Sequence, residues 1–334
     1  MQTATTRPAA PVADPQSKPV QLRHPAPSRD AVVYAKDLSK WYGDVIGLND
    51  VTLEVPRGVT GLLGPNGAGK STFLKLCTGL VRASKGSIRV LGEDPWNNPQ
   101  FLRRIGLAPE HDAFYENLTG LQFVTLLARM QGFSRHKAER RAHDALEQVR
   151  LTPNIHRRVA TYSKGMRQRV KIAQAIVHDP ELLFLDEPLT GTDPVGRREM
   201  IDFIKALAKQ GKSIVVSSHV LYEVEAMTPN ILLIHRGRVI AEGDIHQIRE
   251  LIDEHPHNIR IEVDRPRELA SRLLSLPGVV TVRVPDERHV EAETRKPDDF
   301  YQHALALFQR ERFNIVSLTS PDDNLESVFR YLVK

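Results

Sequence analysis

The chain has 334 residues, of which 41% are hydrophobic and 26% are charged. Such a composition is close to that of an average soluble protein and excludes a fibre or a wholly disordered chain, while the length suggests two domains. The formal net charge of +5 permits attraction to phosphates or to an anionic membrane surface but requires neither. The single cysteine, Cys77, excludes an intrachain disulfide and a cysteine-rich metal site, so we expect a reducing compartment.

The N-terminal segment and the apolar runs of the sequence bear on membrane association. Residues 1–30 are rich in proline and alanine and lack the apolar stretch of a secretory signal, so they predict a disordered tail. The apolar runs are strand-sized and fall short of the roughly 18 consecutive residues of a spanning helix. We therefore expect that the chain does not cross a bilayer by itself.

Short β-branched runs alternate with longer helical patterns from Val32 onward, which is typical of an α/β layered domain. An antiparallel section is expected first, with strands at Val32–Tyr34 and Val45–Val55 around a turn at Gly43 and Asp44. Further strands are expected at Val59–Leu63, Ile88–Leu91, Ile105–Ala108, Leu182–Leu185 and Ser213–Ser217. Helices are expected at Leu121–Met130, Lys137–Val149, Met166–Val177 and Arg197–Ala208, and a hairpin at Ile231–Ile234 and Arg238–Ala241. We assign this first domain to residues 31–254.

The pattern changes after the break at His255–His257. The expected strands are Ile259–Val263, Val280–Val284, His289–Glu293 and Asn314–Leu318, and the expected helices are Glu268–Leu276 and Asp299–Gln309. This order matches the split β-α-β arrangement of ferredoxin-like domains. The sequence predicts a small α+β domain over residues 255–334, closed by a last helix at Asn324–Val333.

A phosphate-binding loop is the first motif with chemical content. The segment 64–71 reads GPNGAGKS and matches G-x-x-x-x-G-K-[ST] between an apolar strand and a helix expected to start near Lys70. Glycines let backbone N–H groups turn toward a phosphate, Lys70 supplies a charge to the β and γ oxygens, and Ser71 is expected to bind Mg²⁺. The residues predicted to hold ATP here are Gly64, Pro65, Asn66, Gly67, Ala68, Gly69, Lys70, Ser71 and Thr72.

Two carboxylates follow the apolar strand that begins at Leu182. Open α/β sheets place ligands at the carboxyl ends of their strands, where Asp186 and Glu187 stand. We expect Asp186 to hold Mg²⁺, and Glu187 to orient and activate the water that attacks the γ-phosphate. Pro188 predicts an extended conformation for Glu187.

A third motif, YSKGMRQR at residues 162–169, carries a family resemblance. Its Ser163 and Gly165 match the Leu-Ser-Gly-Gly-Gln signature of the ATP-binding subunits of ATP-binding-cassette (ABC) transporters, and the whole resembles the Tyr-Ser-Lys-Gly-Met form of the exporter branch. The resemblance implies a P-loop NTPase cassette with a mixed sheet core, an antiparallel β section and a helical subdomain. It also implies a dimer in which Ser163, Lys164 and Gly165 of one subunit meet the ATP held by the phosphate loop of the other.

Four more residues match family positions. Tyr42 resembles the aromatic that stacks on adenine, with Trp41 as the alternative, and His219 resembles the switch histidine that contacts the γ-phosphate. Asp193 resembles the dimer-contact loop. Glu110 stands where the family usually has glutamine, and its carboxylate can still accept from Mg²⁺-bound water while adding a negative charge. The resemblance thus implies Glu187, His219 and Lys70 as the catalytic set.

The implied function is ATP hydrolysis that powers transport, with export favoured, through a separate integral membrane permease. The cassettes are expected to pair as a homodimer or a heterodimer, in the cytoplasm on the inner face of the membrane, with no nucleic acid bound. The segment His111–Leu121, with Phe114 and Tyr115, is the expected socket for a cytoplasmic helix of the permease.

Two other classes of protein share this nucleotide chemistry. A soluble cassette ATPase acting on nucleic acid or in translation would usually carry long coiled-coil insertions or two cassettes, for which the span between Lys70 and Ser163 is too short. A P-loop kinase or GTPase would explain neither the signature nor His219.

Overall fold

The computed structural model describes residues 30–245 and 257–320. The tail expected at residues 1–29 and the helix expected at 324–333 lie outside the described residues. The domain boundary placed after residue 254 also lies outside them and stays a prediction.

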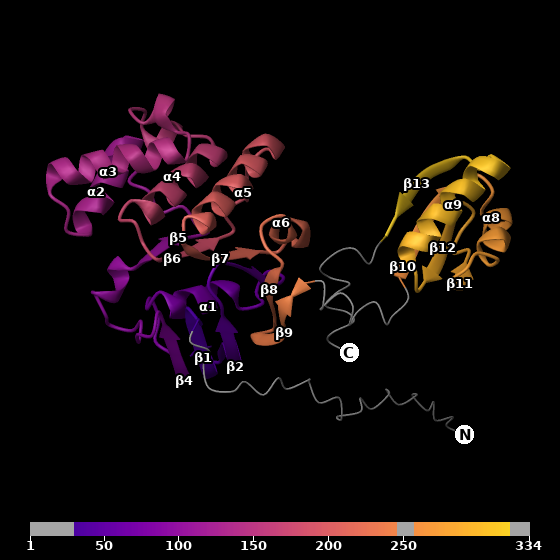
Figure 1. Ribbon diagram of the computed structural model, residues 1–334, viewed down its shortest axis with the longest axis horizontal. Helices are drawn as coiled ribbons and strands as arrows, with labels where there is room; N and C mark the ends of the chain where they lie inside the picture. The colour runs from indigo at the N-terminus through magenta and orange to yellow at the C-terminus, as the bar shows by residue number, and fades with distance from the viewer. Residues whose placement is uncertain (1–29, 246–256, 321–334) are drawn as a thin grey trace, which may run out of the picture.

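A six-stranded sheet forms the centre of the larger unit (Figure 1). Its strands are β3 (Val59–Leu63), β5 (Ile105–Ala108), β6 (Leu182–Asp186), β7 (Ser213–Ser218), β8 (Asn230–His235) and β9 (Arg238–Asp244). The order is β5-β6-β7-β3-β8-β9, parallel throughout except for the β8–β9 hairpin. Every residue of β3, β6 and β7 is buried, because structure covers both faces, and this explains their unbroken apolar runs.

Helices cover both faces of this sheet. On one side lie α2 to α5, and on the other lies α1, between the six-stranded sheet and a smaller one (Figure 1). Their bounds are α1 Lys70–Cys77, α2 Gly120–Met130, α3 Arg135–Gln148, α4 Lys164–Ile176 and α5 Pro194–Lys209. Shorter helices are α6 (Leu221–Glu225), η1 (Phe101–Arg103), η2 (Thr152–Asn154) and η3 (Val159–Thr161). The mixed sheet, the antiparallel section and the helical insert predicted from the sequence are all confirmed.

The smaller sheet is antiparallel and has the order β2-β1-β4. Its strands are β1 (Val33–Tyr42), β2 (Val45–Val55) and β4 (Lys85–Val90). The sequence predicted that the first strand ends at Tyr34, which is wrong, since it continues to Tyr42. Irregular pairing after Ala35 and a left-handed backbone at Asp37 (φ 49°) break the alternation that marks a strand in the sequence.

The start of α5 also differs from its prediction. The sequence placed it at Arg197, but the helix begins at Pro194, with Asp193 as its N-cap. Asp193 accepts a hydrogen bond from the Gly196 N–H at 2.8 Å, which is the usual role of an aspartate before a helix with proline at its first position.

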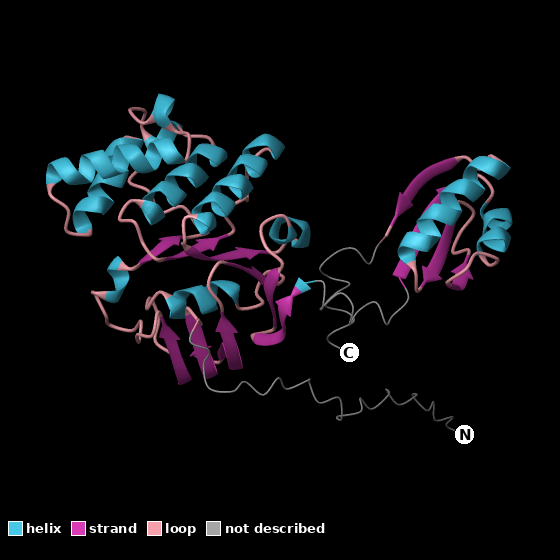
Figure 2. Ribbon diagram, in the orientation of Figure 1, coloured by secondary structure: helices cyan, strands magenta, loops and turns pink. Residues whose placement is uncertain are grey.

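The C-terminal unit is a four-stranded antiparallel sheet with two helices on one face (Figure 2). Its elements are β10 (His257–Val263), α8 (Pro266–Leu273), β11 (Val279–Arg283), β12 (His289–Thr294), α9 (Pro297–Glu311) and β13 (Ile315–Thr319). The strand order β11-β12-β10-β13 is that of a ferredoxin-like fold, as expected. Ile259, Ile261 and Val263 alternate into a core of their own with Leu269 and Phe300.

Candidate functional site

The phosphate loop leaves the end of β3 and enters α1 through positions that only glycine can fill. A Cβ at Gly64 would lie 2.4 Å from the Ile234 carbonyl oxygen, and Gly69, the N-cap of α1, has φ 113°. The Gly237 N–H donates to the Ala68 carbonyl at 2.8 Å and holds the loop against the β8–β9 hairpin. The loop is therefore fixed on both sides.

Lys70 points back into this loop. Its residue is 5% exposed, and its Nζ donates to the Gly64 carbonyl at 2.6 Å. The same ammonium lies 3.4 Å from Oε1 of Glu187, which comes from the end of β6. Lys70 thus connects the phosphate loop with the acidic pair.

A cavity of about 340 Å³ opens in front of the loop. Its lining residues come from the β1–β2 turn, the phosphate loop and two acidic loops: Tyr42, Val45, Ile46, Gly47, Pro65, Asn66, Gly67, Ala68, Gly69, Lys70, Ser71, Thr72, Glu110 and Glu187. Tyr42 is 42% exposed beside it, whereas Trp41 is not a lining residue and faces the Lys85 ammonium at 5.5 Å. The geometry favours Tyr42 over Trp41 as the aromatic of the site.

Val45 and Ile46 are lining residues that sequence reasoning missed. It placed both only in a strand, yet they are exposed at the cavity beside Tyr42. The available signal was two apolar side chains directly after the Gly43–Asp44 turn, where a hairpin usually carries polar ones.

The acidic pair is held by β7. The Ser217 hydroxyl donates to Oδ1 of Asp186, and its oxygen accepts from the Glu187 N–H at 3.0 Å. Nδ1 of His219 lies 3.1 and 3.0 Å from the two carboxylate oxygens of Glu187. The Glu187 carboxylate therefore stands between Lys70 and His219, the two residues predicted to act with it.

The backbone at Glu187 is not extended, contrary to the expectation drawn from Pro188. Its φ is 50°, in the left-handed region. The Ser217 contacts hold its N–H, and the Gln168 amide donates to its carbonyl at 3.3 Å and to that of Thr190 at 2.9 Å. These tertiary contacts outweigh the local effect of Pro188.

Glu110 lies at the end of β5 and half exposed at the cavity. Lys171 donates to its carbonyl at 2.6 Å, and burial lowers the pKa of Lys171 although Asp112 and Glu110 lie close.

The residues predicted to hold Mg²⁺ offer the hard oxygen ligands that this ion accepts: Ser71 and Glu110 at the cavity, and Asp186 beside it. Within residues 30–245 and 257–320, no three His, Cys, Asp or Glu side chains are grouped to hold a metal alone. The donor set fits an ion shared with substrate phosphates.

The signature residues lie elsewhere in the same chain. Ser163 is the N-cap of α4 and accepts from the Met166 N–H at 3.3 Å, while the Lys164 side chain packs over Gly191. A Cβ added to Gly165 would meet nothing within 4 Å. Neither these residues nor Asp193 lines the cavity. The structure brings one group of predicted residues together and leaves the signature open to the outside.

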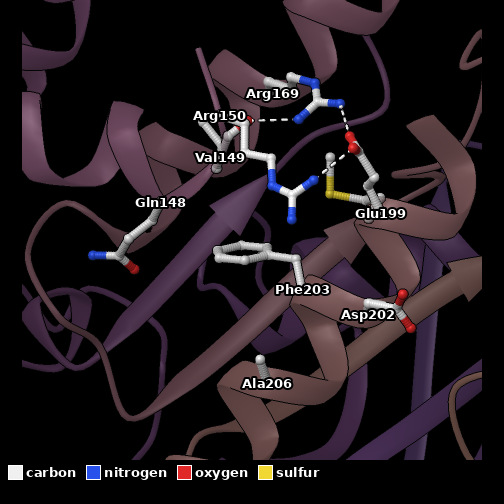
Figure 3. A pocket seen from close by; sticks show the side chains of 9 residues that line it. Gln148, Val149, Arg150, Arg169, Glu199, Asp202, Phe203 and Ala206 are labelled. Atoms are coloured by element: carbon white, nitrogen blue, oxygen red, sulfur yellow. Dashed lines mark hydrogen bonds and ion pairs between the residues drawn. The ribbon is translucent and has the colours of Figure 1, made fainter. Parts of the chain in front are cut away.

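A second pocket, of about 370 Å³, lies between α3, α4 and α5 (Figure 3). Arg150 and Arg169 both reach the Glu199 carboxylate, at 2.5 and 2.7 Å, and Phe203 forms one wall. The two guanidinium groups hold the pKa of Glu199 below its usual range. None of the residues predicted to bind ATP lines this pocket, and its ion pairs tie the helical insert to α5.

Within the described ranges, no helix combines the length and the apolarity that crossing a membrane requires.

Comparisons with known proteins agree with this geometry. A family model described as "ABC transporter" matches residues 48–190. The daunorubicin/doxorubicin resistance ATP-binding protein of Streptomyces peucetius is 35% identical over 87% of this chain and 89% of its own length. The bacitracin transport ATP-binding protein of Enterococcus faecalis is 34% identical over 90% of this chain and 96% of its own.

One more relative and the solved structures align with about two thirds of this chain. The Nod factor export ATP-binding protein of Cupriavidus pinatubonensis is 38% identical over 68% of this chain and 70% of its own. The structure of an ATP-binding subunit of an ABC transporter is 33% identical, with a TM-score of 0.60, over 66% of this chain and 93% of that one. A dimeric bacterial ABC transporter cassette, 24% identical over 64% of this chain and 98% of that one, shares the fold with a TM-score of 0.59. This chain belongs to the family of ABC transporter ATP-binding proteins, which bind and hydrolyse ATP.

Proposed function

We propose that the chain is the motor of an exporter: two cassettes close on two ATP molecules, and this closure drives a separate membrane permease. One observation carries the proposal. The cavity gathers the phosphate loop, Tyr42 and Glu187, while Ser163 and Gly165 lie outside it with open space in front of Gly165. A second cassette is what would bring a signature to each cavity.

Each residue of the cavity has a distinct task toward ATP. Tyr42 stacks on the adenine, and the backbone N–H groups of the phosphate loop and the start of α1 bind the phosphates. The triphosphate competes with the Gly64 carbonyl and with Glu187 for the Lys70 ammonium, since a multiply charged anion is the stronger partner. Glu187 is then free to orient the attacking water, and His219 stays beside the γ-phosphate.

The proposed magnesium site uses residues already in place. Ser71, Asp186 and Glu110 would hold Mg²⁺, which when bound neutralises charge that develops on the β and γ oxygens. Ser217 keeps the Asp186 carboxylate turned in one direction through its hydroxyl.

The permease contact is proposed at the segment 111–121, on the inner face of the membrane. Tyr115 is 62% exposed and is the side chain that a partner helix would meet. Phe114 and Tyr115 both meet the Phe123 ring edge-on, but Phe114 lies closer, with ring centroids 5.2 Å apart against 6.3 Å, and it also carries the Arg167 guanidinium on its face. The socket is therefore proposed around Tyr115, with Phe114 as its support.

The proposed direction of transport is export. Support comes from the names of two relatives, one concerned with drug resistance and one with Nod factor export. In the proposed arrangement the transported molecule passes through the permease and does not touch the cassette.

Light scattering of the full chain with Mg²⁺ and ATP tests the dimer. In the Glu187→Gln variant the phosphate cradle stays and the water loses its base, so we expect tight ATP binding, turnover lowered by about 10² to 10⁴-fold, and a stable dimer. Lys70→Ala serves as control and should stay monomeric, because it weakens nucleotide binding itself.

Two outcomes separate the forms of this proposal. A dimer that appears only after addition of a second cassette copurified with the permease indicates a heterodimer. An ATP-loaded Glu187→Gln variant that stays monomeric at high concentration, with or without that second cassette, overturns the proposed closure.

A further inference from the structure

We propose that Glu223 is a positioning residue for His219, and that Arg197 connects it to the loop that ends at Asp193. The inference rests on the role of His219 in the proposed function. It concerns a short path of contacts from α6 to β7 and α5, none of whose members lines the ATP cavity.

Glu223 fixes the backbone on both sides of His219. The residue lies on α6, is 6% exposed, and its Oε2 accepts from the Ser218 hydroxyl at 3.0 Å. The Ser218 oxygen in turn accepts from the Val220 N–H at 3.0 Å. Because Ser218 and Val220 flank His219, this single hydroxyl sets the direction in which the chain leaves β7.

Arg197 compensates the buried carboxylate of Glu223. Its Nε lies 3.4 Å from Oε1 of Glu223, and its Nη1 donates to the Tyr222 hydroxyl. A buried carboxylate without a cation would carry a large desolvation penalty, so Glu223 needs this partner. The Arg197 N–H donates to the Asp193 carbonyl at 2.8 Å, which places the guanidinium one helical turn from the Asp193 cap.

His219 depends on this backbone because little else holds its side chain. The imidazole is 47% exposed, and its hydrogen-bond contacts in the described structure are those to the Glu187 carboxylate. When Glu187 turns to the attacking water, the imidazole loses these contacts, and the main chain has to hold it beside the γ-phosphate. A displacement of about 1 Å at a reacting group can lower a rate by up to about 10²-fold. Through the contacts of Arg197, Glu223 and Ser218, the position of the His219 imidazole therefore depends on the loop that ends at Asp193.

Steady-state ATP hydrolysis by the full chain tests this inference through Glu223→Ala, Glu223→Gln and His219→Ala. We expect Glu223→Ala to lower kcat by about tenfold to hundredfold, with KM for ATP changed by less than about threefold, since the cradle is untouched. Glu223→Gln keeps an acceptor for Ser218 and should recover part of the loss. Arg198→Ala is the matched control: it removes an exposed arginine of α5 that pairs with Asp202, and it should leave kcat unchanged.

A double-mutant cycle separates positioning from general loss of structure. If Glu223 acts through His219, Glu223→Ala should lower kcat by less than about twofold further in the His219→Ala background. If Glu223→Ala lowers kcat equally in the wild-type and His219→Ala backgrounds, or does not lower it in the wild type, the inference is overturned and the proposed function stands. If His219→Ala alone leaves turnover unchanged, the role proposed for His219 fails instead.

Discussion

Ser217 determines how the two carboxylates after β6 face the site. It is fully buried, lies opposite Asp186 in the β6–β7 register, and contacts the Asp186 carboxylate and the Glu187 N–H with one hydroxyl. Both lone pairs and the proton of a serine hydroxyl can be used at once, so no other side chain of this size serves both neighbours.

Ser217→Ala should weaken catalysis and stability together. The change leaves the Glu187 N–H with one partner fewer and frees the Asp186 carboxylate to rotate. We expect a loss of about 1–3 kcal/mol in the free energy of unfolding, measured in urea, and a higher Mg²⁺ concentration for half-maximal turnover. Unchanged Mg²⁺ dependence would show that Asp186 is oriented without Ser217.

The motif residues were predictable because local spacing defines them. Lys70 and Glu187 follow from short patterns next to apolar strands. Ser217 and Gln168 were missed because their roles depend on contacts with residues 30 and 19 positions away in the chain, which no local pattern encodes. The backbone conformation of Glu187 was wrongly predicted as extended for the same reason.

At the scale of elements, α4 connects most parts of the site. It begins at the Ser163 cap, Gln168 and Lys171 reach the carbonyls of Glu187 and Glu110, and His178 just beyond its end contacts the Ile105 carbonyl at 2.8 Å. A displacement of this helix would reach both acidic loops and β5.

The partly buried imidazole of His178 makes this contact sensitive to pH. Burial lowers its pKa from the ordinary 6.5, so the folded state favours the neutral ring and the unfolded chain takes up a proton first as pH falls. The contribution of His178 to stability is present above pH 6.5 and is lost below it. We expect the stability difference between the wild type and His178→Gln, measured in urea, to shrink from pH 7.5 to 5.5. A difference that grows would contradict this assignment.

Element types were predictable and element ends were less so. Periodic helices such as α2 and buried strands such as β3 have strong, continuous patterns. The predicted ends were wrong where the pattern was weak, as at the bulge in β1, and where the capping signal was overlooked, as with Asp193 and Pro194 at the start of α5. The five-residue α6 was missed because one turn carries no period.

At the scale of the whole molecule, coupling to the permease is proposed to pass through Tyr115. Tyr115→Asp places a charge on an exposed ring position and should abolish most transport while ATP binding and thermal stability stay close to wild type. Transport in membrane vesicles and ATP affinity are the two measurements. Phe114→Asp is unsuitable alone, because Phe114 is less exposed than Tyr115 and packs closer on Phe123, with ring centroids 5.2 Å apart against 6.3 Å, so the change should unfold part of the insert. Normal transport by Tyr115→Asp would remove the socket from this place.

The ferredoxin-like unit was predictable because its elements follow one another through short connections in an order that few folds share. The complete ATP site was not predictable from the residue patterns alone, since half of it is proposed to come from a second chain. The family resemblance supplied that half.

At Glu187, the left-handed backbone places thermal stability and catalytic turnover in conflict. A non-glycine residue held there costs about 1 kcal/mol or more. Under selection for thermal survival alone, we expect this codon to drift toward glycine, with Glu187→Gly melting above Glu187→Ala although both are inactive. Equal melting temperatures of the two variants would show that the backbone at Glu187 is unstrained. A higher melting temperature of the glycine variant would show that only selection for ATP hydrolysis keeps a glutamate at this position.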